Sequence, residues 1–327
     1  MKKLVTGSTG FMGSSIVREL LKDGQEVKVF IRKTSDTRNI DGLDVEKAYG
    51  DIRDGDSMRA ALKGCDTLYY TAAHFSHWTP DRKLPYEVNV EGTKTSMKAA
   101  LDAGVGKVVY TSTNNTLGAH GLIPVDETAQ FNHWKTGDHY SMSKYLAEVE
   151  ARKFIPQGLP IVIVHPTLVI GVRDIKPTPS GRMIIDVATG NMPGYIEGGT
   201  NIIDVEDVAR GHVLAAKKGR VGESYLLGNE NLTVSGYFRL IAEIAGVKPP
   251  RIKIPYHAAV ALGYVFELGA FITGKPPVVT ASEVKIGKLQ EWYDSSKAVK
   301  ELGLPQTPAR VAIGKALNWF RENGYIR

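Results

Sequence analysis

Short apolar runs alternate with amphipathic helical stretches along the first two thirds of this 327-residue chain. The runs are rich in β-branched residues and apolar throughout, which is typical of parallel strands buried on both faces. The stretches between them suit helical crossover connections. The pattern predicts a doubly wound parallel α/β sheet. The expected strands lie in residues 2–7, 26–32, 45–51, 65–73, 107–113, 160–171 and 223–228, and 201–219 is expected to form strand, turn and helix.

The pattern changes after Gly171. A loop rich in Pro, Thr and Ser follows, and the chain from about residue 231 is mostly helical with Pro-rich connectors. We therefore expect a smaller, mostly helical substrate-binding domain, made of 173–200 and 231–327, that covers the open end of the sheet. The sheet domain would comprise 1–172, with 201–230 returning to it.

Composition narrows the class of protein. Hydrophobic residues make up 43% of the chain, enough for a large core, and the net charge of +6 comes from basic residues scattered among acidic ones. This argues against nucleic acid as a partner. The single cysteine, Cys65, excludes a disulfide framework and a thiolate zinc site within the chain. With no leading apolar stretch, a cytoplasmic protein is expected.

The most apolar long stretch is 258–274, which contains Glu267 and three glycines. It is short of a membrane span. We expect a helix packed on the domain or on an oligomer partner, and a helix lying on a membrane surface is the less favoured alternative.

The first strand runs into the segment TGSTGFMGSS, which places Gly7, Gly10 and Gly13 three residues apart. Gly7 would allow a tight turn from strand to helix, Gly10 would let the backbone approach a pyrophosphate, and Gly13 would let the helix pack closely on the strand. The following helix N-terminus would offer free N–H groups to phosphate. This predicts a dinucleotide site, and a purely structural glycine turn is the alternative.

Two further strand ends bear on the cofactor. The second strand ends at Arg32 and Lys33, where an NAD site usually has an acidic residue for the ribose hydroxyls. Arg32 could clamp a 2′-phosphate, which favours NADP over NAD, although a solvated basic strand end would look the same. After the third strand, Asp51 is placed to accept a hydrogen bond from an adenine amino group, with the Ile52 backbone at the ring edge.

Tyr140 and Lys144 are four residues apart in HYSMSKYLAE, so a helix would place both on one face. The chain also contains the motifs TGSTGFMG, GDIRD, TAA (71–73), NVEGT (89–93), YTST (110–113), YSMSK (140–144) and HPTLVIG (165–171). With these motifs it resembles the extended short-chain dehydrogenases/reductases, that is, the NAD-dependent epimerase/dehydratase family with its Rossmann fold. The motifs occur in family order over roughly the first 230 residues. HWTPD (77–81) and IKPTPSG (175–181) resemble the dihydroflavonol-4-reductase-like branch, and within it the hopanoid-associated sugar epimerases.

The resemblance implies that Tyr140 is the catalytic proton-transfer group and that Thr113 orients the substrate oxygen. Lys144, with the positive nicotinamide of the oxidised cofactor, is expected to lower the pKa of Tyr140 toward neutrality and to bind the nicotinamide ribose. The cofactor contacts implied are Gly7, Thr9, Gly10, Phe11, Met12, Gly13, Arg32, Asp51, Ile52, Thr71, Ala72, Ala73, Asn89, Thr111, Tyr140, Lys144, Pro166 and Leu168.

The substrate side is expected to involve His74, Trp78, Thr113 and Asn114. His74 and His77 have no evident third ligand nearby, so no metal is expected. Asn89 would support the site or cap a helix. His165 departs from the Arg common in relatives. His120, His133, Trp134 and His139 would form a substrate lid or plain surface.

These residues predict an enzyme that reduces a ketone or aldehyde with NADPH through Thr113, Tyr140 and Lys144. The alternative in the same family is an NAD-dependent nucleotide-sugar epimerase or dehydratase, and the dehydratase is disfavoured because Asn114, not an acidic residue, follows Thr113. A non-catalytic NADP-binding sensor would not need the Thr–Tyr–Lys set. The resemblance also implies a homodimer through helices near 90–103 and 140–154.

Overall fold

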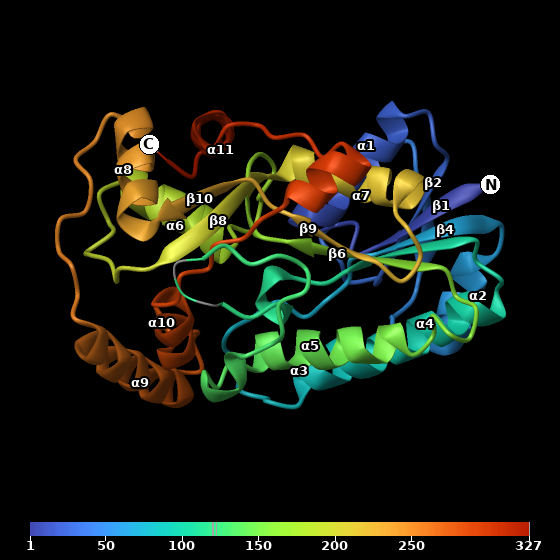
Figure 1. The fold of residues 1–327 in the computed structure, drawn as a ribbon, viewed down its shortest axis with the longest axis horizontal. Helices are drawn as coiled ribbons and strands as arrows, with labels where there is room; N and C mark the ends of the chain where they lie inside the picture. The colour runs from blue at the N-terminus through green and yellow to red at the C-terminus, as the bar shows by residue number, and fades with distance from the viewer. Residues whose placement is uncertain (120, 122, 327) are drawn as a thin grey trace.

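The structure is a computed structural model that describes residues 1–119, 121 and 123–326. A seven-stranded sheet lies toward the N-terminal end of an elongated molecule (Figure 1), with strand order β3-β2-β1-β4-β5-β6-β9. All of its neighbouring strands are parallel. Its strands are β1 (Lys2–Thr6), β2 (Val27–Ile31), β3 (Glu46–Tyr49), β4 (Cys65–Tyr70), β5 (Lys107–Thr111), β6 (Ile161–Pro166) and β9 (Ser224–Leu227).

Helices cover both faces of this sheet (Figure 1). Helices α1 (Phe11–Lys22) and α7 (Val205–Lys218) pack together on one face, and α2 (Gly55–Leu62), α4 (Gly92–Asp102) and α5 (His139–Arg152) lie on the other. Each face buries its own apolar cluster, in which strand residues meet these helices. The predicted doubly wound sheet is confirmed, because strands buried on both faces need this double cover.

A second, three-stranded sheet stands beside the first, in the order β10-β8-β7. Its strands are β7 (Leu168–Ile170), β8 (Gly199–Asp204) and β10 (Glu230–Thr233). A third apolar cluster joins it to α6 (Pro179–Ala188), α8 (Val234–Ala245) and α11 (Ala309–Glu322). The remaining elements are α3 (Leu84–Tyr86), η1 (Glu87–Glu91), η2 (Asn114–Thr116), η3 (His133–Lys135), α9 (Tyr256–Thr273), α10 (Ala281–Gly287) and η4 (Ala298–Leu302).

The second sheet corrects three sequence expectations. The run 160–171 is two strands, because the chain leaves the main sheet after Pro166 and β7 pairs with β8 instead. Strand β8 belongs to this second sheet, whereas the following α7 and β9 return to the main one. Strand β10, which pairs antiparallel with β8, lies where mostly helix was expected.

The strand order reverses between β1 and β4, which lie side by side although β2 and β3 come between them in sequence. Loops after these two strands lead away in opposite directions and leave a crevice at the carboxyl ends of the strands. The second sheet and α9–α10 lie beyond that same end of the main sheet (Figure 1). Any ligand in the crevice therefore meets both parts of the molecule.

Candidate active site

A continuous cavity of about 1360 Å³ occupies the crevice. It is lined by residues from both sheets and from α9 and α10. Of the predicted cofactor residues, the following line it: Gly7, Thr9, Gly10, Phe11, Met12, Gly13, Arg32, Asp51, Ile52, Thr71, Ala72, Ala73, Thr111, Tyr140, Lys144, Pro166 and Leu168. These residues come from seven separate segments of the sequence, so the fold brings the predicted set to one place. Their individual roles remain predictions.

The turn from β1 to α1 depends on two glycines. Gly7 has φ +64°, and a Cβ there would lie 2.8 Å from Thr71 Oγ1. A Cβ on Gly13 would lie 2.2 Å from the Gly7 carbonyl oxygen, which no real packing allows. Both positions thus require glycine, one for its backbone conformation and one for the close approach of helix to strand.

The N-terminus of α1 faces the cavity without a side-chain cap. Gly10 occupies the cap position, no side chain caps the helix, and its first turn carries no acidic residue. Backbone N–H groups at this end are therefore left for another partner, and the helix dipole favours a negative one. The cradle fits a pyrophosphate, as the sequence predicts.

Charged groups surround the cavity next to the carboxyl ends of β2 and β3. The Asp51 carboxylate accepts two hydrogen bonds from Arg53, each 2.9 Å long. These bonds, more than any other effect, hold the pKa of Asp51 below its usual range. The Asp36 carboxylate likewise forms ion pairs with Arg38 and with Lys176, which extends from the loop after β7.

Arg32 is exposed and lines the cavity beside these pairs. Within the part of the chain that the structure describes, no carboxylate comes within ion-pair distance of its guanidinium. Its backbone N–H donates to Ser35 Oγ at 3.1 Å, which fixes the turn after β2. An uncommitted cation at this place suits an anionic group such as a 2′-phosphate.

Tyr140 and Lys144 lie one turn apart on α5, and Thr113 lies opposite them after β5. Lys144 is buried, and its Nζ donates to the Thr111 carbonyl oxygen at 2.8 Å. Burial lowers the pKa of Lys144 to about 8, against the opposing charge of Glu148. The end of β5, the strand that leads to Thr113, thereby holds the ammonium in place.

The pKa of Tyr140 departs from the sequence expectation. Burial raises it well above its ordinary value, the charge of Asp138 raises it further, and a hydrogen bond with Thr113 opposes both. The predicted downward shift is therefore not produced by the protein's own groups. Burial is the main reason, and the charge that acts on the phenol is the Asp138 carboxylate, while the Lys144 ammonium donates to the Thr111 carbonyl oxygen.

Asn89 holds two parts of the site together. It is 2% exposed within η1, where its Oδ1 accepts from the His74 backbone N–H at 2.7 Å. Its Nδ2 donates to the His74 carbonyl oxygen at 3.2 Å and to Ser143 Oγ at 2.9 Å. The side chain is therefore neither a helix cap nor a lining residue. It ties the segment after β4 to the helix that carries Tyr140.

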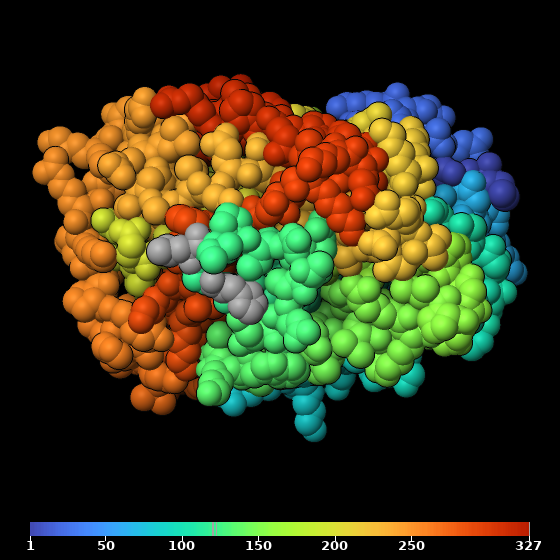
Figure 2. Space-filling model, viewed as in Figure 1, coloured from blue at the N-terminus to red at the C-terminus, as the bar shows by residue number. Residues whose placement is uncertain are grey.

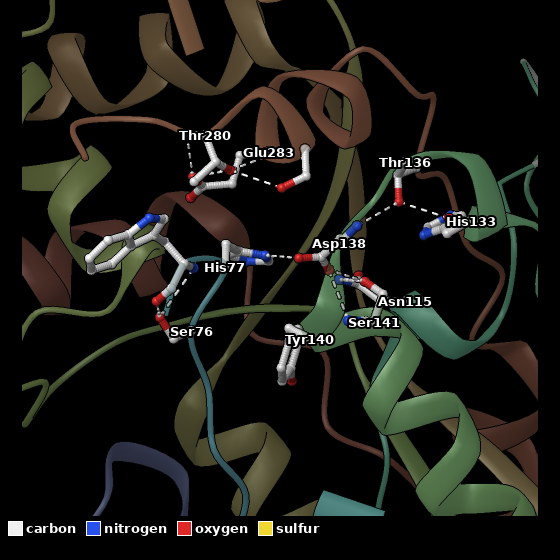
Figure 3. A network of polar contacts seen from close by, with 12 residues as sticks. Ser76, His77, Asn115, His133, Thr136, Asp138, Tyr140, Ser141, Thr280 and Glu283 are labelled. Carbon is white, nitrogen blue, oxygen red and sulfur yellow. Dashed lines mark hydrogen bonds and ion pairs between the residues drawn. The ribbon is translucent and has the colours of Figure 1, made fainter. Parts of the chain in front are cut away.

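A histidine–carboxylate pair adjoins Tyr140 and was not predicted (Figure 3). His77 Nδ1 lies 3.0 Å from Asp138 Oδ1, and Asp138 Oδ2 caps α5 by accepting from Ser141 N at 2.8 Å. Burial works to lower the pKa of His77, but the hydrogen bond and charge of Asp138 outweigh it and the pKa is raised. The His77 ring stands edge-on to Tyr140 with centroids 5.5 Å apart.

Beyond Tyr140 the cavity is mainly apolar. Its walls there include Phe75, Leu84, Val88, Met183, Met192, Tyr195, Tyr237, Phe238, Leu262, Phe266 and Val284. Among them lies the carboxyl group of Glu291, a half-buried residue whose buried Oε1 has no hydrogen-bond partner within the described residues. Burial raises the pKa of Glu291 to about 8, although His77 opposes the shift. Glu291 is therefore a neutral acid at the cavity wall near neutral pH.

The other predicted substrate residues are placed unequally. His74, Thr113 and Asn114 line the cavity, and Asn114 Nδ2 donates to the Tyr293 hydroxyl at 3.3 Å. Trp78 does not line it, because its ring packs edge-on against Phe271 of α9, with centroids 6.2 Å apart.

Three histidines noted in the sequence, His133, His139 and His165, do not line the cavity. His165 is fully buried, with hydrogen bonds to Thr116 and Ser224. His133 and Trp134 lie on η3, and His139 starts α5, where its Nδ1 pairs with the Tyr86 hydroxyl at 3.0 Å. His120 lies outside the described residues.

Comparison with known proteins shows the family of the chain. The NAD dependent epimerase/dehydratase family profile matches residues 3–228. The chain is 39% identical to a Synechocystis sp. protein provisionally named dihydroflavonol 4-reductase, over 99% of this chain and 95% of that one. It is 36% identical to sterol demethylase protein B of Methylococcus capsulatus, over the full length of both.

Among solved structures, a nucleoside-diphosphate-sugar epimerase from Pseudomonas aeruginosa is 27% identical, with a TM-score of 0.83 over 100% of this chain and 99% of that one. The names of these relatives include a reductase, a sterol demethylase protein and a sugar epimerase, so their named reactions differ. The predicted resemblance is confirmed: the chain belongs to the NAD-dependent epimerase/dehydratase family and is an NAD(P)-dependent oxidoreductase of the extended short-chain dehydrogenase/reductase type.

Proposed function

We propose that this enzyme uses NADPH to reduce a ketone or aldehyde carbonyl on a large, mainly apolar molecule. The observation that carries the proposal is the layout of the single cavity. Its cofactor end has an uncommitted Arg32, its middle has Thr113, Tyr140 and Lys144, and its far end is apolar.

The bound cofactor supplies a hydride to the carbonyl carbon. Tyr140 donates its hydroxyl proton to the carbonyl oxygen, so the product is an alcohol and the atoms balance. The raised pKa means that Tyr140 carries its proton at neutral pH, as a proton donor must. The Thr113 hydroxyl would orient the same oxygen, and Lys144 would hold the ribose while its positive charge stabilises the phenolate that remains after Tyr140 has donated its proton.

The substrate end supports an apolar substrate. The wall formed by Tyr237, Phe238, Leu262 and Phe266 offers little to a sugar and much to a ring system or an isoprenoid. Two relatives have names that fit such a substrate: the sterol demethylase protein B noted above and a 3-beta-hydroxysteroid dehydrogenase of Mycolicibacterium neoaurum, 28% identical over 98% of this chain.

The epimerase alternative rests on a separate observation. Lys176 and Arg182 also line the cavity, and they could meet the diphosphate of a nucleotide sugar. Asp174 and Asp186 line the same region and offset that charge, which is why we place the apolar carbonyl substrate first.

Calorimetric titration of the cofactor-stripped protein tests the cofactor assignment. NADPH should bind at least about tenfold more tightly than NADH, as one charge-assisted hydrogen bond to the 2′-phosphate is worth roughly 1.5–3 kcal/mol. Arg32→Ala should abolish this preference. Lys33→Ala is the matched control, because this neighbouring exposed cation does not line the cavity. Equal affinities, or tightly held NAD, would favour the epimerase.

A further inference from the structure

Helix α9 exposes apolar side chains around most of its circumference. Its exposed large residues are Leu262, Tyr264, Val265, Phe266, Leu268, Phe271 and Ile272, and Val278 follows in the next loop. Among the described residues, α9 is the one helix long and apolar enough to cross a membrane, with a mean hydropathy of 1.2, yet only 17% of it is buried in the protein. An apolar helix exposed in this way lacks the polar outer face that is typical of a surface helix in a globular protein.

The helix is anchored to the protein along one narrow line. Only Ala259, Gly263 and Ala270 are buried, and a Cβ on Gly263 would lie 2.6 Å from the backbone nitrogen of Ala281. The expected packing on the domain is therefore mainly contact with α10, with an added edge-on contact between Phe271 and Trp78. Figure 2 shows the orange segment that contains α9 at an outer corner of the molecule, away from the N-terminal end.

The one acidic residue of the helix is turned inward. Glu267 Oε1 accepts from the Ala281 backbone N–H at 2.7 Å and so caps the start of α10. Cations flank the apolar face instead: Arg251 and Lys253 precede α9, and Lys275 follows it, all exposed. From residue 248 to 275 the chain carries four cations and Glu267 as its only carboxylate.

Two further lysines lie over aromatic rings of the same helix. Lys285 Nζ donates to the Tyr264 hydroxyl at 3.1 Å, and Lys288 Nζ lies 4.2 Å from the centre of the Tyr256 ring. Aromatic rings with basic groups at their polar ends are typical of segments at a membrane interface. The apolar face and its flanking cations thus complement a partner that has an apolar interior and a negatively charged surface.

Part of the same helix lines the cavity, including two residues of its exposed apolar face. Ala259, Leu262 and Phe266 face it, as do Val278 and Val279 of the following loop. The apolar wall of the substrate end is therefore continuous with the exposed apolar face of α9. A substrate dissolved in lipid could reach the cavity past this helix without crossing water.

We propose that α9 docks flat on an anionic lipid surface, with its cations at the headgroups and its apolar side chains below them. A spanning orientation does not fit, because 18 residues reach about 27 Å and the Gly263 contact keeps the helix on α10. A second copy of this chain fits less well, since a twofold interface centred on α9 would bring the flanking cations of both copies together. The docking proposal stands on this surface and does not depend on the reaction assigned to the cavity.

Vesicle co-sedimentation of the full chain tests the proposal. Phosphatidylcholine vesicles with and without phosphatidylserine are the probes, at low and high salt. The protein should pellet with the anionic vesicles and should be released at least severalfold by high salt. The double variant Leu268→Asp/Ile272→Asp should lower partitioning at least about tenfold, because both side chains are exposed and neither lines the cavity.

Val311→Asp, an exposed apolar position on α11, is the matched control and should partition as the wild type does. Unchanged circular dichroism and NADPH affinity would show that each variant is folded. The proposal is overturned if the wild type stays in the supernatant with anionic vesicles at low salt. It is equally overturned if light scattering finds a dimer that the double variant dissolves, since a second copy would then cover α9.

Discussion

Removing the Asn89 side chain should destabilise the protein strongly although it does not line the cavity. Asn89→Ala deletes three hydrogen bonds, to His74 N, His74 O and Ser143 Oγ, from a side chain that is 2% exposed. Each lost bond costs about 1 kcal/mol net, and stranded partners cost about 1–3 kcal/mol where water cannot reach them. We expect a loss of about 3–5 kcal/mol in the free energy of unfolding.

Urea unfolding followed by circular dichroism measures this loss as a lower midpoint at an unchanged slope. Asn89→Asp should cost at least as much, because the carboxylate would face the His74 carbonyl oxygen, to which Asn89 donates. Asn318→Ala, at an exposed position of α11, is the control and should stay within about 0.5 kcal/mol of the wild type. A loss below about 1 kcal/mol for Asn89→Ala would refute the idea that this residue ties the two segments together.

Three further predictions follow from the same geometry. Gly13→Ala should weaken NADPH binding in calorimetry at least about tenfold and cost about 1–3 kcal/mol of stability, because the new Cβ would meet a backbone oxygen at 2.2 Å. Gly314→Ala is the control and should leave NADPH binding unchanged, because the new Cβ would meet open space on α11. The pKa of Glu291 is about 8 in the folded protein, above its value in the unfolded chain, so the free energy of unfolding of the wild type should fall as pH rises from about 4.5 to 8. Glu291→Gln should flatten this pH dependence, measured by urea unfolding at several pH values. An unchanged pH dependence would mean that the carboxyl is not buried as a neutral acid. Asp138→Asn should lower the pKa of His77 in NMR titration, since the carboxylate is what holds it up, and a pKa that stays in place would show another source for the shift.

The sequence predicted those features that a local segment determines by itself. Gly7 and Gly13 lie within one turn, and their spacing already implies the tight approach that the structure shows. Tyr140 and Lys144 lie on one helix, so their common face follows from helical geometry. The parallel sheet was predicted for the same reason, because each strand is apolar throughout, as burial on both faces requires.

Features made by distant segments were missed. The pair of His77 and Asp138 joins residues 61 apart, and Glu291 reaches the cavity from the far C-terminal part of the chain. One signal was available, since Asp138 precedes the Tyr140 helix at a position where a carboxylate caps it. The division of 160–171 between two sheets could not be read either, because both halves are equally apolar and only the pairing partner differs.

Tyr140→Phe tests the central claim most directly. Wild type and variant would be given deuterated NADPH and a panel of apolar cyclic ketones, with deuteride transfer followed by mass spectrometry and NADPH affinity by calorimetry. The account predicts deuterated alcohol from the wild type, and a variant that keeps its NADPH affinity but transfers at least about a hundredfold more slowly, the usual contribution of a positioned proton donor. Equal transfer by the variant would contradict the role of Tyr140, and transfer by the wild type from NADH alone would contradict the assignment of NADPH.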